Sequence, residues 1–453
     1  MIRGLRRLLP VLGIFLMVAV ISPIVPRDDT RVVQACAFAT PPTTYEGLED
    51  RSLYMAAMDL AGNDMLFPKD KFFSQAHLEV GTRNNRVPGE LYIPPTLLKA
   101  ISWIESVATQ GAPDLPFGAI GPALVSFDCG YGVAQVTSGM TAPLGEGGDV
   151  TDEQALTATH FAYNIGRGAA ILADKWNSAP EARPVSGIDT NSDPKLVENW
   201  YYAIWSYNGF TGPGANRSNH PLDPLYGAWP RTPYSCGPAN DGLSHNRSLF
   251  PYQELVYGCM AHPPTVQGNQ LWKPLDASLP DLNNPYWRRP LDLANFRYPY
   301  SAMDMPTAQP SHQDPTPKPT LVHRFAVLGI PNMVVDPPIV LVNVRPGESA
   351  TPGEVHISNT GSGIVAWRVT ANRSWVTVSQ VAGIAVGANL PCLSSSPCDR
   401  AATLRISVDP DKVLGSDAAV VTIRGIGHGG RIQDIAVFVR ANVAIGIPGT
   451  TRN

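Results

Sequence analysis

Charged residues are scarce in this sequence, and they form no long run of one sign. Only 16% of the 453 residues are Asp, Glu, Lys or Arg, and the formal net charge is −4. A protein that neutralises phosphates needs a basic patch or stripe, so the composition argues against a nucleic-acid partner. Hydrophobic residues make up 44% of the chain. A globular protein of about two or three domains is therefore expected.

The residue spacings typical of metal sites are also missing. There is no CxxC or HExxH motif, and the nine His residues are scattered, so metal binding is disfavoured. The six Cys residues are few but even in number, which in an exported chain favours disulfides. We expect Cys392 to pair with Cys398, because only a short Ser/Pro loop separates them, and a Cys236–Cys259 pair is plausible.

The N-terminus carries a long apolar run in a chain that otherwise has few. Three Arg residues precede an uncharged stretch from Leu8 to Val25, as in an export signal. The run is close to the ~20 residues that span a bilayer, so a cleaved signal peptide and an uncleaved anchor both stay open. Ala35 and Ala37 offer a small-x-small cleavage site, and residues 1–37 are assigned to the signal or anchor. The protein is predicted to lie outside the cytoplasm, secreted or anchored at the cell envelope, and to contact membrane only through this segment.

Composition divides the rest of the chain into four regions. Residues 38–210 are predicted to form a mainly α-helical domain. Residues 211–305 are rich in Pro, Asn, Gly and aromatic residues, and should form an irregular extension packed on that domain. Residues 306–320 are a Pro-rich linker, expected to be extended and solvated. Residues 321–453 alternate apolar and polar residues over short runs, which predicts an antiparallel β-sandwich. The predicted class is a multidomain α+β protein.

Residues that commonly begin or end helices occur at several places in residues 38–210 and once in the extension. The first helix begins at the Pro pair of "IPPTLLKAISWIES". A second starts at Thr151, where Gln154 completes a capping-box pattern, and continues through "HFAYNIGRGAAILADKW". Asp193 can cap a third helix, which Gly209 ends. A further short helix is predicted at "YQELVYGCM".

The first of these helices ends with an acid. Leu98, Ile101 and Glu105 fall at positions i, i+3 and i+7, so Glu105 lies on the apolar side of the helix. A partly desolvated carboxyl has a raised pKa and can hold a proton near neutral pH. The general acid of glycosidic-bond cleavage needs that property. A helix-terminal Glu that simply reaches solvent is the alternative.

Several short motifs follow this acid in a fixed order. After Glu105-Ser106 come Gly132-Val133-Ala134-Gln135, then Asn164 and Gly168 in "YNIGRG", then Tyr207-Asn208-Gly209. The order and spacing resemble the soluble lytic transglycosylase family, which is related in fold to goose-type lysozyme. The resemblance covers about a quarter of the chain. Ala134 stands where the family usually has Met.

The resemblance implies a lysozyme-like, mainly α-helical catalytic domain and a peptidoglycan lytic transglycosylase. Glu105 would act as general acid and then as base in cleaving the β-1,4 bond between N-acetylmuramic acid and N-acetylglucosamine, leaving a 1,6-anhydro end. Ser106, Gln135, Tyr207 and Asn208 would bind or position the sugar. The partner would be the glycan strands of peptidoglycan. No metal or organic cofactor is implied, and a monomer is expected.

Two alternatives stay open. A hydrolytic lysozyme acting on the same bond would need a second carboxylate, for which Asp128 is the candidate, although a turn Asp bonded to its own backbone is as good an interpretation. A wall-binding protein without catalysis is the other alternative. Asn164 is expected to be a helix-packing amide rather than a substrate contact.

The remaining regions give looser indications. Aromatic residues of the extension, including Tyr252, could stack on sugars, but we expect them to pin the extension onto its host domain. The C-terminal region loosely resembles the BACON family of immunoglobulin-like modules in the stretches around Trp367 and Trp375. Such modules are often proposed to bind carbohydrate or to act as spacers. A core position is expected for Trp375.

Overall fold

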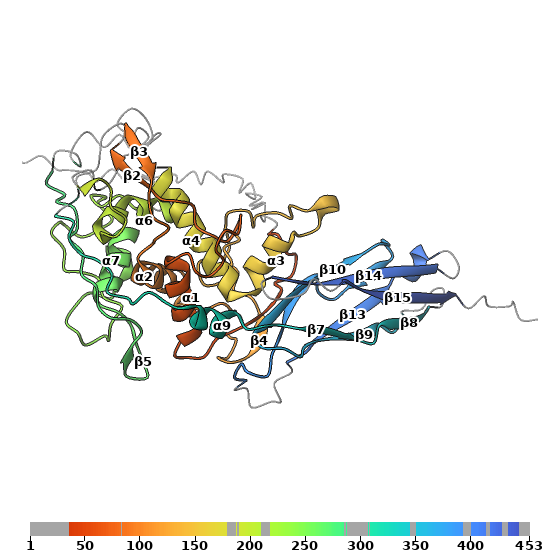
Figure 1. The fold of residues 1–453 in the computed structure, drawn as a ribbon. Helices are drawn as coiled ribbons and strands as arrows, with labels where there is room; N and C mark the ends of the chain where they lie inside the picture. The colour runs from red at the N-terminus through yellow and green to blue at the C-terminus, as the bar shows by residue number, and fades with distance from the viewer. Residues whose placement is uncertain are drawn as a thin grey trace, which may run out of the picture. The chain divides into compact units, whose positions relative to one another are not determined.

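The computed structural model contains both helices and sheets, so the chain is an α+β protein (Figure 1). It describes residues 36–82, 84–178, 187, 190–209, 218–284, 287, 307, 309–344, 350–392, 400–413, 417–427 and 434–443. Most of the predicted signal or anchor, and Cys398, lie outside these residues. Within the described ranges, no helix is both long and apolar enough to cross a membrane.

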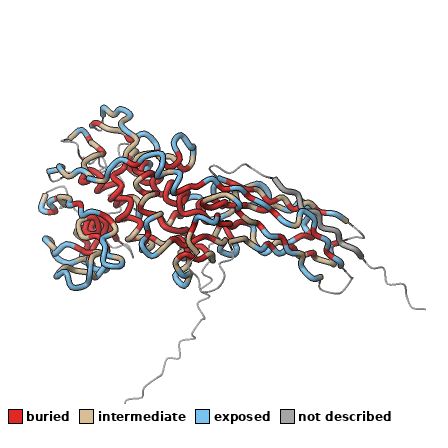
Figure 2. The backbone as a smooth tube through the Cα atoms, turned by 60° about the horizontal axis from the view of Figure 1, so that its bottom comes forward, coloured by how far each residue is buried: buried red, intermediate tan, exposed pale blue. Residues whose placement is uncertain are grey.

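The first part of the described chain contains six of its α-helices. They are α1 (Ser52–Gly62), α2 (Pro95–Ser106), α3 (Asp152–Thr159), α4 (Phe161–Asn177), α6 (Tyr201–Tyr207) and α7 (Tyr252–Ala261). Helix α2 packs against α1 and α7, and α4 packs against α1, α3 and α6. Their buried apolar residues share one core, and buried residues are drawn red in Figure 2.

Three short two-stranded sheets and several 3-10 turns accompany the helices in the described chain. The paired strands are β1 (Thr43–Tyr45) with β4 (Ile120–Pro122), β2 (Glu79–Thr82) with β3 (Asn85–Pro88), and β5 (Thr265–Val266) with β6 (Asn269–Gln270). The 3-10 turns are η1 (Glu146–Gly148), η3 (Val197–Trp200) and η4 (Arg247–Leu249).

The helix predictions hold for the starts of α2 and α3 but not for every end. The Thr151–Gln154 capping box forms, with the hydroxyl of Thr151 accepting from the Gln154 N–H at 3.2 Å. The predicted continuous helix is wrong, because it breaks at His160, whose backbone is extended (φ −123°, ψ 113°). The His160 imidazole accepts from the Ala162 N–H at 3.2 Å and so begins α4 as a separate helix. An unpaired N–H at a helix start is satisfied in this way.

The third predicted helix begins later than its cap signal suggested. The Asp193 carboxylate accepts from the Lys195 N–H at 2.9 Å within a turn. Only after this turn do η3 and α6 follow. Gly209, with φ +85°, lies past the end of α6 as predicted.

The proline-rich segment was predicted to be an extended, solvated linker, and most of its described residues 309–320 are exposed, but several contacts also hold it against the helical part. The Asp314 carboxylate accepts from the Thr96 N–H at 2.6 Å and from the Thr96 hydroxyl at 3.0 Å. His312 pairs with the buried Glu198. The N–H groups of the first turn of a helix lack partners within the helix, and a carboxylate supplies one. The segment is therefore tied along the helical part.

Residues 321–453 do not start as a β-sandwich. They begin with helix α9 (Leu321–Leu328), which packs on α1, and the Arg324 Nε–H donates to the Leu66 carbonyl at 2.9 Å. The strands follow as β7 (Met333–Asp336), β8 (Ile339–Val344), β9 (Gly353–Asn359), β10 (Ile364–Ala371), β11 (Val376–Val378), β12 (Ala382–Val386), β13 (Ala402–Val408), β14 (Asp417–Ile426) and β15 (Asp434–Val443).

These strands form two sheets around one core, as the alternating pattern predicts. One sheet has the order β12-β10-β14-β15-β8 and the other β11-β13-β9-β7. The neighbours are antiparallel except for β15 and β8, which are parallel. Trp367 and Trp375 are both buried in the core between the sheets, which confirms the core position expected for Trp375.

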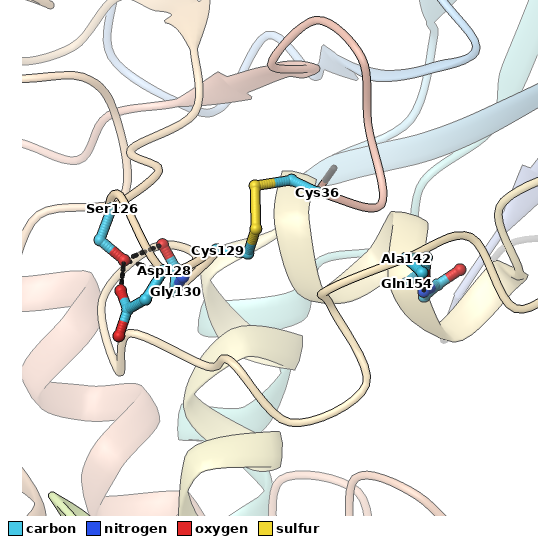
Figure 3. The surroundings of a disulfide bond; sticks show 7 residues. All are labelled: Cys36, Ser126, Asp128, Cys129, Gly130, Ala142 and Gln154. Carbon is cyan, nitrogen blue, oxygen red and sulfur yellow. Dashed lines mark hydrogen bonds between the residues drawn. A yellow bond between two sulfur atoms is a disulfide. The ribbon is translucent and has the colours of Figure 1, made fainter. Parts of the chain in front are cut away.

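Two disulfides lie in the helical part. Cys236 is bonded to Cys259 as predicted. Cys36 is bonded to Cys129, with 5.4 Å between their Cα atoms (Figure 3). The Ala37 N–H also donates to the Met140 carbonyl at 2.9 Å. The folded body thus includes Cys36 and Ala37, which the sequence-based boundary had assigned to the signal or anchor.

Candidate active site

Glu105 occupies the last turn of α2, one residue before the helix ends at Ser106. The apolar side of this helix is buried, and Glu105 itself is half-buried. Burial removes water from the carboxyl group, which disfavours its charged form and raises the pKa of Glu105 from 4.5 to about 7. The predicted placement of the acid on the apolar side of the helix is confirmed.

Three side chains from later in the chain surround this carboxyl group. The Tyr252 hydroxyl, at the start of α7, donates to Glu105 Oε1 at 2.5 Å. The Asn208 side chain, just after α6, also faces Glu105 and favours its charged form. Arg247 of η4 donates to the Ile104 carbonyl at 2.6 Å, which places its positive charge beside the end of α2. All three lower the pKa of Glu105 and so offset part of the effect of burial.

Asn164 of α4 holds the Gly132–Gln135 segment from behind. Its Oδ1 accepts from the Ala134 N–H at 2.7 Å, and its Nδ2 donates to the carbonyls of Tyr131 at 2.7 Å and Thr157 at 2.9 Å. Asn164 is fully buried. The expectation that it is a packing amide rather than a substrate contact is confirmed by these bonds.

Ser106 and Tyr207 fasten the same segment from its other sides. The Ser106 hydroxyl donates to the Val133 carbonyl at 2.7 Å, and the Tyr207 hydroxyl donates to the Ala134 carbonyl at 2.9 Å. Helix α4 approaches closely at Gly168, where a Cβ would lie 2.5 Å from the Cβ of Ala134. These two predicted substrate contacts therefore bond to backbone in this structure, and they set the position of the segment relative to Glu105.

Gln135 and Asp128 lie outside this hydrogen-bonded centre. The Gln135 Nε2 donates to the Gly132 carbonyl at 2.9 Å, and its backbone is left-handed (φ 45°). Asp128 is exposed, and its Oδ1 accepts from the Ser126 hydroxyl at 2.5 Å within a turn (Figure 3). Asp128 thus lies in a turn as that interpretation held, but its carboxylate is bonded to the Ser126 side chain and not to its own backbone as was suggested. Its negative charge still raises the pKa of Glu105 slightly, as the smallest of the contributions.

Sequence-based reasoning missed Tyr252 and Arg247 as site residues. Tyr252 was expected only to pin the extension in place, and it is indeed buried. It also reaches Glu105 across a sequence separation of 147 residues, because α7 packs directly against α2. No periodicity or spacing signal connects residues so far apart. The short helix predicted at "YQELVYGCM" and the expected Cys236–Cys259 pair were the indications that this part of the extension is ordered.

Metal ligands do not gather around this carboxyl group or elsewhere in the described part of the chain. Among those residues, no group of three or more His, Cys, Asp or Glu side chains is arranged to hold a metal ion.

No protein-family model and no curated protein matches the chain. Among solved structures, a Bacteroides ovatus GH5 xyloglucanase in complex with a XXXG heptasaccharide is similar at 17% identity over 25% of this chain and 19% of that chain, with a TM-score of 0.17. The periplasmic chaperone SfaE is similar at 9% identity over 26% of this chain and 60% of that chain, with a TM-score of 0.20. WR4, a C. elegans MSP family member, is similar at 16% identity over 24% of this chain and 96% of that chain, with a TM-score of 0.17. Likenesses of this size carry no argument about what the chain does.

Proposed function

We propose that this protein is a peptidoglycan lytic transglycosylase with a lysozyme-like catalytic domain. The observation that carries the proposal is Glu105, a half-buried carboxyl group held by Tyr252 and Asn208, with a pKa raised to about 7. Such a group is about half protonated at neutral pH, so it can give a proton and take one back within a single turnover. The ordered motifs that resemble the family support the same assignment.

The proposed reaction needs only this carboxyl group from the protein. Glu105 gives its proton to the oxygen that leaves with N-acetylglucosamine, as the bond from that oxygen to the anomeric carbon of N-acetylmuramic acid breaks. The 2-acetamido group of N-acetylmuramic acid stabilises the positive charge, as in substrate-assisted glycosidases. The Glu105 carboxylate then removes the proton from the 6-hydroxyl group of the same sugar, whose oxygen bonds to the anomeric carbon. The 1,6-anhydro ring closes, no water is consumed, and Glu105 is protonated again.

A hydrolase acting on the same bond is the second candidate, because the charge of Asp128 reaches Glu105. Ordinary glycosidases use a second carboxyl group as nucleophile or as base for water. Asp128 is engaged by Ser126, which favours the transglycosylase. Replacing Asp128 by Asn separates the two, because a hydrolase that depends on it would lose turnover while keeping its fold.

The β-sandwich is proposed to be an immunoglobulin-like, BACON-type spacer. Trp367 and Trp375 lie in its core, so neither is placed to stack on a sugar. The two disulfides support an oxidising, extracytoplasmic location for the protein.

The test is mass analysis of fragments released from purified peptidoglycan by protein that keeps Cys36, with Glu105→Gln as the matched control. We expect products ending in 1,6-anhydro-N-acetylmuramic acid from the wild type and none from the variant. Reducing ends in their place would establish the hydrolase. If the wild type and the variant sediment with peptidoglycan equally well and the wild type releases no fragments, both enzymatic functions are refuted. The protein would then be a wall-binding protein without catalysis.

A further inference from the structure

The orientation of one amide decides how well Glu105 can carry a negative charge. The Asn208 side chain ends in an NH2 group, which donates hydrogen bonds, and an oxygen, which only accepts them. When its NH2 group faces Glu105, Asn208 stabilises the carboxylate and so lowers the pKa of Glu105, which is the direction of its effect in this structure. With its oxygen toward Glu105, it would repel that carboxylate. Asn208 is exposed, so packing does not choose between the two orientations.

A second amide, Asn219 of the extension, makes that choice. Asn219 is buried, and its Nδ2 donates to Asn208 Oδ1 at 2.9 Å. Because the Asn208 oxygen is engaged there, its NH2 group is left to face Glu105. The arrangement depends on the side chain of Asn219 having a donor to offer.

Asn219 is fixed in turn by the helix that carries Tyr252. The backbone carbonyl of Asn219 accepts from Gln253 Nε2 at 2.9 Å, and the same Nε2 donates to the Tyr201 hydroxyl of α6 at 3.2 Å. Gln253 is fully buried and adjoins Tyr252 in the chain. One short stretch of α7 thus holds both donors that reach Glu105: Tyr252 directly, and Asn208 through Asn219.

We propose that Asn219 is a positioning residue that keeps the Asn208 amide turned so that its NH2 group donates to Glu105. This role rests on the proposed lytic transglycosylase function, in which Glu105 must become a carboxylate and then be protonated again. Two fixed donors, the Tyr252 hydroxyl on Oε1 and the Asn208 NH2, stabilise that carboxylate without any side chain having to rotate. Preorganised donors of this kind act most strongly when charge develops.

The test compares Asn219→Asp with the wild type in the full protein. The substitution keeps the shape but leaves only acceptors at neutral pH, so the Asn208 NH2 turns toward the new carboxylate and its oxygen turns toward Glu105. The pKa of Glu105 is measured without substrate from the infrared band of its protonated carboxyl group, identified by its loss in Glu105→Gln. We expect this pKa to rise by about one unit, and kcat to fall about tenfold with KM changed less than about twofold.

Asn208→Ala supplies the control, because the side chain is exposed and its loss does not threaten the fold. If Asn219 acts through Asn208, the effect of Asn219→Asp on the pKa of Glu105 falls to less than about half in the Asn208→Ala background, where only repulsion between carboxylates remains. An effect of equal size in both backgrounds would overturn the proposal, as would an unchanged pKa in Asn219→Asp.

The two proposals fail separately. Released anhydro products together with an unchanged pKa and kcat in Asn219→Asp would remove the role of Asn219 and leave the lytic function standing. If Asn219→Asp raises the pKa of Glu105 through Asn208 but the wild type releases no fragments, the positioning of the amide is established and the lytic function is removed.

Discussion

Replacing Glu105 by Gln is expected to stabilise the protein, and to do so only where the carboxyl group would be charged. The pKa of Glu105 is raised in the folded state to about 7 from an ordinary value of 4.5. The folded protein therefore binds a proton more tightly than the unfolded chain does. The contribution of Glu105 to the stability is greatest below pH 4.5, where the group is protonated in both states, and is lost as the pH rises from there through 7.

The size of this effect follows from the displacement of the pKa. At about 1.4 kcal/mol per pKa unit, a rise from 4.5 to about 7 corresponds to about 3 kcal/mol of stability lost between acid and alkaline pH. The amide in the Glu105→Gln variant cannot ionise, so this loss is absent there, while the amide oxygen can still accept from Tyr252. The variant minus wild-type difference in unfolding free energy should therefore be smallest near pH ~4 and grow by about 3 kcal/mol by pH ~8.

Urea unfolding of both proteins at several values between about pH 4 and pH 8 measures this difference. Every other titrating group is common to the two proteins, so its contribution cancels. A poorer contact of the variant's amide with Asn208 would change the difference in unfolding free energy by the same amount at every pH. The measured quantity is therefore the change of this difference with pH. A difference that stays constant within about 0.5 kcal/mol would refute the reasoning that burial raises the pKa of Glu105.

Three further substitutions test the framework around the site. Asn164→Ala removes three buried hydrogen bonds to backbone and should lower the unfolding free energy by about 3 kcal/mol or more in urea titrations; a loss under about 1 kcal/mol would contradict the role of this amide. Gly168→Val forces α4 away from Ala134 and should destabilise by about 1–3 kcal/mol while reducing fragment release at least about tenfold; unchanged release would show that this close contact is not needed. Cys129→Ser breaks the bond to Cys36 and should lower the unfolding free energy by about 2–4 kcal/mol, which thermal unfolding shows as a lower Tm. A Tm equal to that of the wild type would contradict a stabilising role for this bond.

Local signals in the sequence were sufficient for several elements. The Pro pair predicted the start of α2, the Thr151–Gln154 box predicted the start of α3, and the alternating pattern predicted the two sheets. These features depend on residues a few positions apart, whose backbone groups and side-chain faces obey fixed periodicities. The same periodicity put Glu105 on the buried side of its helix. The bonds between Asp314 and Thr96 join residues far apart in the chain, and no local signal indicated them.

The sequence by itself determined the candidate acid, the order of the motifs around it and the division into a helical part and a sheet part. Only the tertiary structure decided what surrounds the acid. Tyr252, Arg247 and Asn219 reach the site because α7 packs on α2 and because the extension folds back over the end of that helix. The Cys36–Cys129 bond likewise joins residues 93 positions apart. Contacts between segments so distant depend on how whole faces pack together, and no single stretch of sequence specifies them.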